Sequence, residues 1–255
     1  SSISAVYFSP DDLDLVKGEP SGRRKFIDNL IYQVRPSFYK YLQGYQRVLA
    51  QRNTLLKTIK AKPNLVKTLD PWDEQLSEFG SQLINERLKL LQRISFLSED
   101  YFKKFAREGT VLKISYRSEI DFSDPESIKR NFKNKLVACR EKAILRSFTS
   151  VGPHRDDIDF LIDGKDVKQY ASQGQQRLTV LCLKFAQRNL LYTERGEYPI
   201  LLLDDVMSEL DIHRRQLIME REDHQVFITT TDLKFIPEEI LEKSFLYSIK
   251  AGVLR

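Results

Sequence analysis

Two adjacent aspartates, Asp204 and Asp205, follow an apolar stretch of the sequence. Residues 200–203 read ILLL, which predicts a buried strand that ends at the first aspartate. A carboxylate in that place can hold Mg²⁺, directly or through water, beside nucleotide phosphates. A second carboxylate one residue later can orient or deprotonate an attacking water. A single aspartate would be explained as a helix cap or turn residue, but the pair, followed by MSELD, favours a Walker B site.

The stretch ASQGQQR, at 171–177, carries a second group of polar residues. Ser172 and Gln175 have the spacing of a capping box at a helix N-terminus. Such a helix start, with a hydroxyl and the flexible Gly174, can also hold a phosphate through backbone N–H groups. Capping alone would explain the stretch in isolation. Its position one helix before the aspartates favours a role at a nucleotide.

The order of these motifs resembles that of the ATP-binding-cassette ATPases. In those proteins a signature helix precedes the Walker B strand, a D-loop and a strand that ends in a switch residue. By this resemblance Asp204 is the metal ligand, Asp205 is the catalytic base, and Thr231 takes the switch position, although it could simply be a polar strand end. The resemblance implies these nucleotide-binding residues: Ser172, Gln173, Gly174, Gln175, Arg177, Asp211 and Thr231.

Four stretches together narrow the resemblance to the RecF family of recombinational-repair ATPases. They are PDDLDLVKGEPSGRRKFID (10–28), GPHRDDIDFLIDG (152–164), SQGQQR (172–177) and LLLDDVMSELD (201–211), and they span nearly the whole chain. Asp156 and Asp157, in the second stretch, are explained as hairpin caps. His154 and Arg155 receive no chemical role from the sequence.

The RecF resemblance implies an ATP- and Mg²⁺-dependent homodimer that binds double-stranded or gapped DNA. The signature residues Ser172, Gly174 and Gln175 of one subunit would contact the γ-phosphate of ATP held by the other. Arg177 would support that loop or the dimer face. With RecO and RecR, such a protein promotes RecA loading at single-strand gaps.

A Walker A loop, G-x-x-x-x-G-K-[ST], would supply the main phosphate cradle. No two of the ten glycines in the sequence are five residues apart, so the motif does not occur in it. In RecF-like proteins this loop lies in an N-terminal lobe, and we expect the present sequence to begin after it. The chain would then be part of a weak DNA-dependent ATPase and inactive alone.

The net charge of +5 is unevenly distributed along the sequence. Residues 21–60 contain nine basic side chains and one acid, Asp28, which gives this window +8 and leaves −3 for the remainder. Two amphipathic helices with basic outer faces would explain part of this charge, but the imbalance favours a polyanion such as DNA. The predicted DNA-binding residues are Arg23, Arg24, Lys25, Arg35, Lys40, Arg47, Arg52, Lys57 and Lys60.

Hydrophobic periodicity divides the chain into a helical middle and an α/β end. Leucines recur every seven residues from Leu76 to Leu97, which predicts one long helix over 74–108, in a coiled-coil-like hairpin or a bundle. After residue 150, apolar strands alternate with helices, as in a parallel sheet covered on both faces. Asp163-Gly164 predicts a hairpin between two strands.

The predicted fold class is therefore α/β: the parallel-sheet lobe of an ABC/SMC-type ATPase head with an inserted, mainly α-helical arm. The predicted segments are 1–20 (end of the core lobe), 21–147 (arm) and 148–255 (ATPase lobe). No apolar run approaches the roughly 20 residues of a membrane span, and the N-terminus does not resemble a signal peptide, so we expect a cytoplasmic protein without a membrane partner. Two other functions stay open, a transporter-type nucleotide-binding subunit and a nucleotide-independent interaction module.

Overall fold

A computed structural model of the protein describes residues 4–106, 108–209, 215, 225–251 and 253–254. The chain forms two compact units, which we describe separately. The first comprises Ser1–Asp12 and Gln187–Arg255, and the second comprises Leu13–Ala186. Helix α8 (Gln173–Arg195) begins in the second unit and ends in the first. The predicted functional segments 1–20, 21–147 and 148–255 follow other boundaries and stay a prediction.

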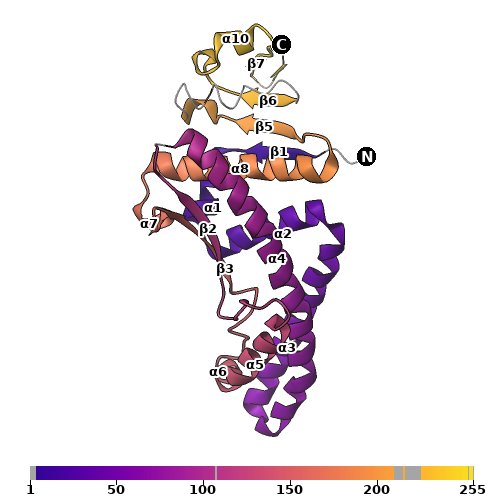
Figure 1. Cartoon of the computed structure of the whole chain (residues 1–255). Coiled ribbons are helices and arrows are strands. Elements are labelled where there is room, and N and C mark those ends of the chain that lie inside the picture. Colours follow the sequence, from indigo (N-terminus) through magenta and orange to yellow (C-terminus); the bar gives the residue numbers. More distant parts are fainter. Residues whose placement is uncertain (1–3, 107, 210–214, 216–224, 252, 255) are drawn as a thin grey trace. The chain divides into compact units, whose positions relative to one another are not determined.

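A three-stranded parallel sheet organises the first unit (Figure 1). Its strands are β1 (Ala5–Phe8), β5 (Ile200–Asp204) and β6 (Val226–Thr229), in the order β1-β5-β6. The apolar side chains of neighbouring strands explain the sheet, since Val6 of β1 and Leu203 of β5 are buried. The predicted parallel sheet is thus confirmed, and its register brings the last residues of β5 and β6 side by side.

Short elements complete the described part of the first unit. A 3-10 turn, η4 (Met207–Glu209), follows β5, and η5 (Leu233–Phe235) and α10 (Glu238–Leu241) follow β6. An antiparallel pair, β7 (Ile249–Lys250) and β8 (Val253–Leu254), lies near the C-terminus. The alternation of strands and helices in the sequence also predicts a helix at IHRRQLIMERE (212–222), which lies outside the described residues except for Arg215.

Five helices build most of the second unit, and we call them the arm. They are α2 (Pro20–Val34), α3 (Tyr39–Ala61), α4 (Asp70–Phe105), α5 (Ile128–Ala138) and α6 (Arg140–Arg146). Two short elements, η1 (Pro10–Leu13) and α1 (Asp14–Lys17), precede them. The long predicted helix is confirmed as α4, one uninterrupted helix of 36 residues.

The seven-residue leucine repeat of α4 reflects packing in a helix bundle. Leu76, Leu83 and Leu90 are buried, and α4 packs against both α3 and α5. The crossing with α5 is so close that a Cβ on Gly80 would lie 2.3 Å from the Phe132 ring. Helix α3 and α4 are joined by η3 (Pro63–Leu69), so they form a helical hairpin.

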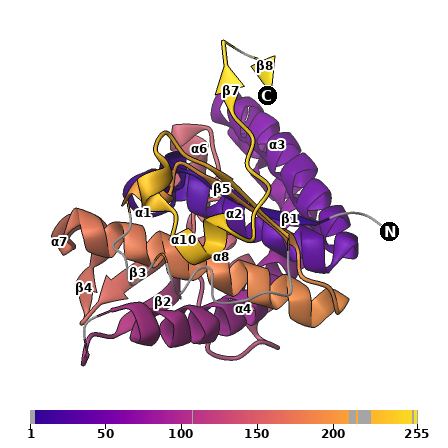
Figure 2. The ribbon, with the colours of Figure 1, turned by 90° about the horizontal axis from the view of Figure 1, so that it is seen from above.

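A small antiparallel sheet lies against the arm. Its strands are β2 (Leu112–Arg117), β3 (Asp157–Ile162) and β4 (Lys165–Asp166), in the order β2-β3-β4. Figures 1 and 2 show β2 beside α4, and β3 contacts α2.

The predicted hairpin after residue 157 is confirmed, but its second strand is short. Asp163 and Gly164 both have positive φ, 50° and 77°, as the tight turn requires. Helix α7 (Val167–Tyr170) replaces the rest of the predicted strand because the Asp166 carboxylate accepts the Gln169 N–H at 3.0 Å and caps that helix. No helix in the described part of the chain combines the length and apolar composition that a membrane crossing needs.

Candidate functional site

Asp204 is the last residue of β5, and both neighbouring strands donate hydrogen bonds to its carboxylate. The Tyr7 hydroxyl of β1 lies 2.7 Å from Oδ2, and the Thr229 hydroxyl of β6 lies 2.5 Å from Oδ1. These two bonds, first that from Thr229, hold the pKa of Asp204 below its ordinary value. The carboxylate is therefore ionised at neutral pH and available to a cation.

Asp205 turns the chain away from the sheet in a left-handed conformation, with φ of 51°. Aspartate tolerates this region better than most residues. Its backbone N–H is held by Thr229, 3.1 Å from the hydroxyl oxygen and 3.2 Å from the carbonyl oxygen. Its Oδ1 atom is buried and has no hydrogen-bond partner in the part of the chain that the structure describes. An acceptor left in this condition is costly unless a further donor, such as a water, reaches it.

The two carboxylates fit a hard divalent cation beside phosphates. Mg²⁺ is usually bound through one or two carboxylates, several waters and the phosphate oxygens of its substrate. Asp204 offers an ionised carboxylate at the sheet edge, and Asp205 offers an unpartnered oxygen one residue later. The donor set is consistent with the predicted division into a metal ligand and a water-orienting base.

The signature stretch forms the predicted capping box at the start of α8. The Ser172 N–H donates to Gln175 Oε1 at 2.9 Å, and the Gln175 N–H donates to Ser172 Oγ at 3.3 Å. Gln173 and Gly174 are exposed, and no atom lies within 4 Å of the place where a Gly174 Cβ would stand. The capping interpretation is confirmed, and the open helix start leaves space for a phosphate group. Arg177 is half-buried one turn later.

The remaining predicted nucleotide residues are Thr231 and Asp211. Thr231 is exposed just after β6. Asp211 falls outside the described residues. Since the aspartates belong to the first unit and Ser172 to the second, each part of the predicted nucleotide site stands by itself.

Most of the predicted DNA-binding side chains face solvent. Six of the nine are exposed and Arg24 is half-buried. Arg35 is paired with Glu86 at 2.7 Å, and Lys60 donates to the Leu145 carbonyl at 3.0 Å. The exposed residues are Lys25, Arg35, Lys40, Arg47, Lys57 and Lys60.

The prediction was wrong for Arg23 and Arg52, which are buried in ion pairs. Arg52 is fully buried, with its Nε 2.7 Å from Asp73. Arg23 donates from Nε and Nη2 to Asp157, at 2.7 and 3.0 Å. Both guanidinium groups are almost fully buried and bonded to carboxylates, so neither is available to a DNA phosphate. The helical phase gives the signal for Arg52, since it lies four residues from Val48 and from Leu56 on the buried face of α3.

The sequence GPHRDD, residues 152–157, forms a buried junction that sequence reasoning missed; we call it the 152–157 motif. Gly152 has φ of 123°, and a Cβ there would lie 2.6 Å from both Phe132 and Tyr45. The His154 ring lies between the Tyr45 hydroxyl, 2.7 Å from Nδ1, and the Thr149 carbonyl, 3.0 Å from Nε2. Burial lowers the pKa of His154 to about 4, so the ring is neutral, with Nε2–H as donor and Nδ1 as acceptor.

Asp156 lies at the start of β3, at the opposite end of the strand from the hairpin turn. The interpretation of Asp156 and Asp157 as hairpin caps is therefore wrong. The Tyr116 hydroxyl donates to Asp156 at 2.6 Å and the Ser118 hydroxyl at 2.8 Å. Burial nevertheless raises the pKa of Asp156 to about 6.

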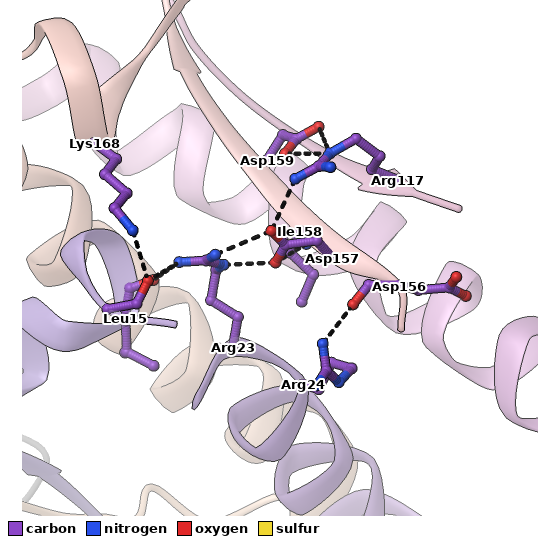
Figure 3. A network of polar contacts seen from close by, with 10 residues as sticks. Leu15, Arg23, Arg24, Arg117, Asp156, Asp157, Ile158, Asp159 and Lys168 are labelled. Carbon is purple, nitrogen blue, oxygen red and sulfur yellow. Dashed lines mark hydrogen bonds and ion pairs between the residues drawn. The ribbon is translucent and has the colours of Figure 1, made fainter. Parts of the chain in front are cut away.

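Asp157 connects three elements through charged contacts (Figure 3). Besides the two bonds from Arg23, it accepts Arg117 Nη2 at 2.9 Å, and Arg24 donates to the Asp156 carbonyl at 2.8 Å. Arg23 and Arg24 come from α2, while Arg117 comes from β2.

Arg87 of α4 extends this buried junction to the centre of the arm. It forms a bidentate pair with Asp28 of α2, at 2.8 and 2.9 Å, and donates to the Pro153 carbonyl at 2.7 Å. A signal was present in the sequence, because charged residues at Asp28 and Arg87 fall on the apolar faces of their helices. The 152–157 motif thus fixes α2, α3, α4 and β2 to one another.

Comparison with known proteins identifies close relatives of the whole chain. No family model matches the sequence. The DNA replication and repair protein RecF of Natranaerobius thermophilus is 41% identical over 263 residues, which covers 98% of this chain and 68% of the relative. RecF of Symbiobacterium thermophilum is 40% identical over 264 residues, covering 99% and 68%.

A solved structure gives the same result for the fold. The recombination mediator protein RecF with ATP, in the RecFOR pathway, matches with a TM-score of 0.87 at 32% identity and covers 99% of this chain and 67% of that one. The chain therefore spans about two thirds of the length of these relatives.

Proposed function

Because this chain belongs to the RecF family, we propose that it is the DNA-contacting and signature-bearing part of an ATP-controlled DNA replication and repair protein. One observation supports the nucleotide part above all others. Two neighbouring carboxylates stand at the edge of a parallel sheet, one kept ionised by its neighbours and the next with an unpartnered buried oxygen. Ligands of open parallel sheets bind at this edge, beyond the carboxyl ends of the strands.

In the proposed mechanism the two aspartates have different roles. Asp204, fixed by Tyr7 and Thr229, would hold Mg²⁺, which when bound neutralises charge on the phosphates. Asp205 would accept a hydrogen bond from the attacking water through its unpartnered Oδ1 and take up its proton. Thr229 positions both residues, since it bonds the carboxylate of one and the backbone of the other.

The start of α8 would recognise the γ-phosphate of ATP held by a second subunit. Ser172, Gly174 and Gln175 would contribute a hydroxyl and backbone N–H groups of a helix N-terminus, where a negative charge is stabilised. The sequence contains no Walker A motif, so the proposed cradle is supplied by residues outside it. Binding of ATP would close a homodimer around DNA, and hydrolysis would release it.

The exposed basic side chains of α3 would contact the phosphate backbone of duplex or gapped DNA. Lys40 and Arg47 are seven residues apart and share one face of the helix, and Lys57 is exposed further along it. Contacts of this kind supply affinity and not sequence choice. The proposed role includes cooperation with RecO and RecR in loading RecA at single-strand gaps, in the bacterial cytoplasm.

Asp205→Asn, in the intact protein that carries this chain, tests the proposed function. The amide cannot take up a proton, so ATP turnover should fall by about 10²-fold or more. Binding of a non-hydrolysable ATP analogue, and the tighter dimerisation that accompanies it, should persist. ATP turnover is measured by phosphate release and dimerisation by analytical ultracentrifugation.

Glu239→Gln is the matched control, because it removes an exposed carboxylate from the same unit. It should leave turnover unchanged. Unchanged turnover in Asp205→Asn would show that the aspartates are remnants in an interaction module. A dimer no tighter with the ATP analogue than without it would contradict the ATP-controlled closure.

A further inference from the structure

A cavity of about 530 Å³ opens in the second unit, where the start of α2 lies beside α6 and the 152–157 motif. Four cationic side chains line it, and we call it the basic cleft. Arg24 comes from α2, Lys142 and Arg146 come from α6, and Arg155 comes from the motif. None of these positions is part of the proposed nucleotide site.

The charge of the basic cleft is not balanced by its own acids. Glu19 and Glu119 also line it, but Glu119 is already paired with Lys135 at 3.3 Å. Among the described residues, none forms an ion pair with Lys142, Arg146 or Arg155. The lining therefore has four cations against two acids, one of them neutralised elsewhere. Such a surface attracts an anion.

The buried junction beside the cleft holds Arg24 in place (Figure 3). Arg24 is half-buried and donates to the Asp156 carbonyl at 2.8 Å. The Arg155 N–H donates to the Gly152 carbonyl at 2.8 Å, and its guanidinium lies 5.7 Å from the centre of the Phe148 ring. Arg155 is the exposed charged residue of the 152–157 motif, whose other charged groups are turned inward. The junction thus presents a fixed guanidinium group at Arg24 and an exposed one at Arg155, and guanidinium groups match phosphate geometry well.

A second cavity of about 270 Å³ continues the basic cleft towards α3. It shares Ser21, Arg24 and His154 with the cleft and adds Lys25 and Gln46. His154 contributes no charge to either cavity, because its pKa is lowered to about 4 by burial. The two cavities form a continuous lining from α6 across α2 to α3.

We propose that the basic cleft binds the sugar–phosphate backbone of single-stranded DNA. Its volume is that of a small-molecule pocket, which can take one or two nucleotides but not a duplex. Phe148, beside Arg155, is 36% exposed and offers a ring on which a base can stack. A cationic groove with an adjacent aromatic ring is the usual arrangement for single-strand binding. The proposal rests on the proposed DNA function but uses residues other than those of the α3 face.

A double charge reversal, Lys142→Glu with Arg146→Glu, tests the proposal in the intact protein. Both side chains are exposed, so folding should be kept, as judged by circular dichroism. Binding of a fluorescent oligothymidylate should weaken by roughly tenfold or more, and its log K against log salt slope should flatten by about 1.4 for two lost contacts. Phe148→Ala should weaken the same binding without changing the slope. Blunt duplex should bind within about twofold of wild type if its contacts lie on α3.

Lys113→Glu with Arg130→Glu is the matched control, since it makes the same charge change at exposed positions outside the cleft. It should leave oligothymidylate binding unchanged. Wild-type oligothymidylate affinity in the cleft variant, or equal losses for cleft and control variants, would overturn the proposal. If Lys40→Glu with Arg47→Glu also left every DNA unaffected, the proposed DNA function itself would fail, and not the cleft alone.

Discussion

At the scale of single residues, the arm depends on charges removed from water. Asp73 is fully buried and accepts bonds from two arginines, Arg52 Nε at 2.7 Å and Arg140 Nε at 2.8 Å. Arg52 also donates to the Thr149 hydroxyl at 2.8 Å. A protein with a buried ion pair of this kind is little more stable than one in which both partners are replaced by apolar residues. The loss of only one partner, however, leaves a buried charge unpaired.

Asp73→Ala should therefore destabilise the protein strongly. It leaves the buried Arg52 guanidinium without its carboxylate, a loss of about 3–5 kcal/mol in the free energy of unfolding. The midpoint of urea unfolding, followed by circular dichroism, measures the change. Asp100→Ala is the control, because it breaks an exposed pair with Lys104 and should cost about 1 kcal/mol or less. Equal midpoints for the two variants would contradict a buried charge at Arg52.

Two residues of the 152–157 motif give opposite pH dependences. The pKa of Asp156 is raised from 3.8 to about 6 in the folded protein. Its contribution to the free energy of unfolding is therefore full at low pH and is lost as the pH rises towards 6. The folded pKa of His154 is lowered from 6.5 to about 4, so its contribution is full above 6.5 and is lost as the pH falls towards 4. Between pH 4 and 6 the two effects largely cancel in the wild type.

Asp156→Asn should leave the pH dependence of stability to His154 alone. The variant's loss of stability relative to wild type should grow as the pH falls from 6 to 4, by up to about 3 kcal/mol at 1.4 kcal/mol for each pH unit. His154→Gln should show the opposite trend, with its relative loss growing as the pH rises from 4 to 6.5. Urea midpoints at several pH values measure both. Parallel profiles for wild type and Asp156→Asn would show that the carboxyl is not buried as described.

At the scale of elements, local patterns in the sequence correctly predicted individual helices, strands and caps. The leucine repeat predicted α4, ILLL predicted β5, and the Ser172–Gln175 spacing predicted the cap of α8. Each of these depends on local periodicity or on contacts within three or four residues, which a single sequence carries.

The failures concern contacts between residues far apart in the chain. Arg52 was predicted to bind DNA because it belongs to the basic window 21–60. Its position on the buried face of α3 instead places it inside the helix bundle. The 152–157 motif contacts residues up to 134 positions away, such as Tyr116 and Arg23, and no spacing rule anticipates those pairs. The contacts of a buried polar junction depend on how all the helices of the arm pack together. From the sequence alone, its charged residues are therefore expected at the surface.

At the scale of the whole molecule, the chain separates its two proposed activities. The carboxylates Asp204 and Asp205 lie in the unit of the parallel sheet, while the basic surfaces lie in the unit of the arm. Helix α8 begins with the signature residues and ends in the unit of the aspartates. This helix therefore connects the proposed signature residues to the unit that carries the aspartates.

Charge reversal on α3 should weaken duplex binding without changing its sequence preference. Lys40→Glu with Arg47→Glu removes two exposed cations that share one helix face, so the log K against log salt slope should flatten by about 1.8. Anisotropy titrations of two unrelated duplexes across a salt series measure both effects. Lys103→Glu with Arg130→Glu, equal in charge change but placed on α4 and α5, should keep a nearly wild-type slope. If both variants flattened the slope equally, duplex binding would follow the net charge of the molecule, and α3 would not be its contact surface.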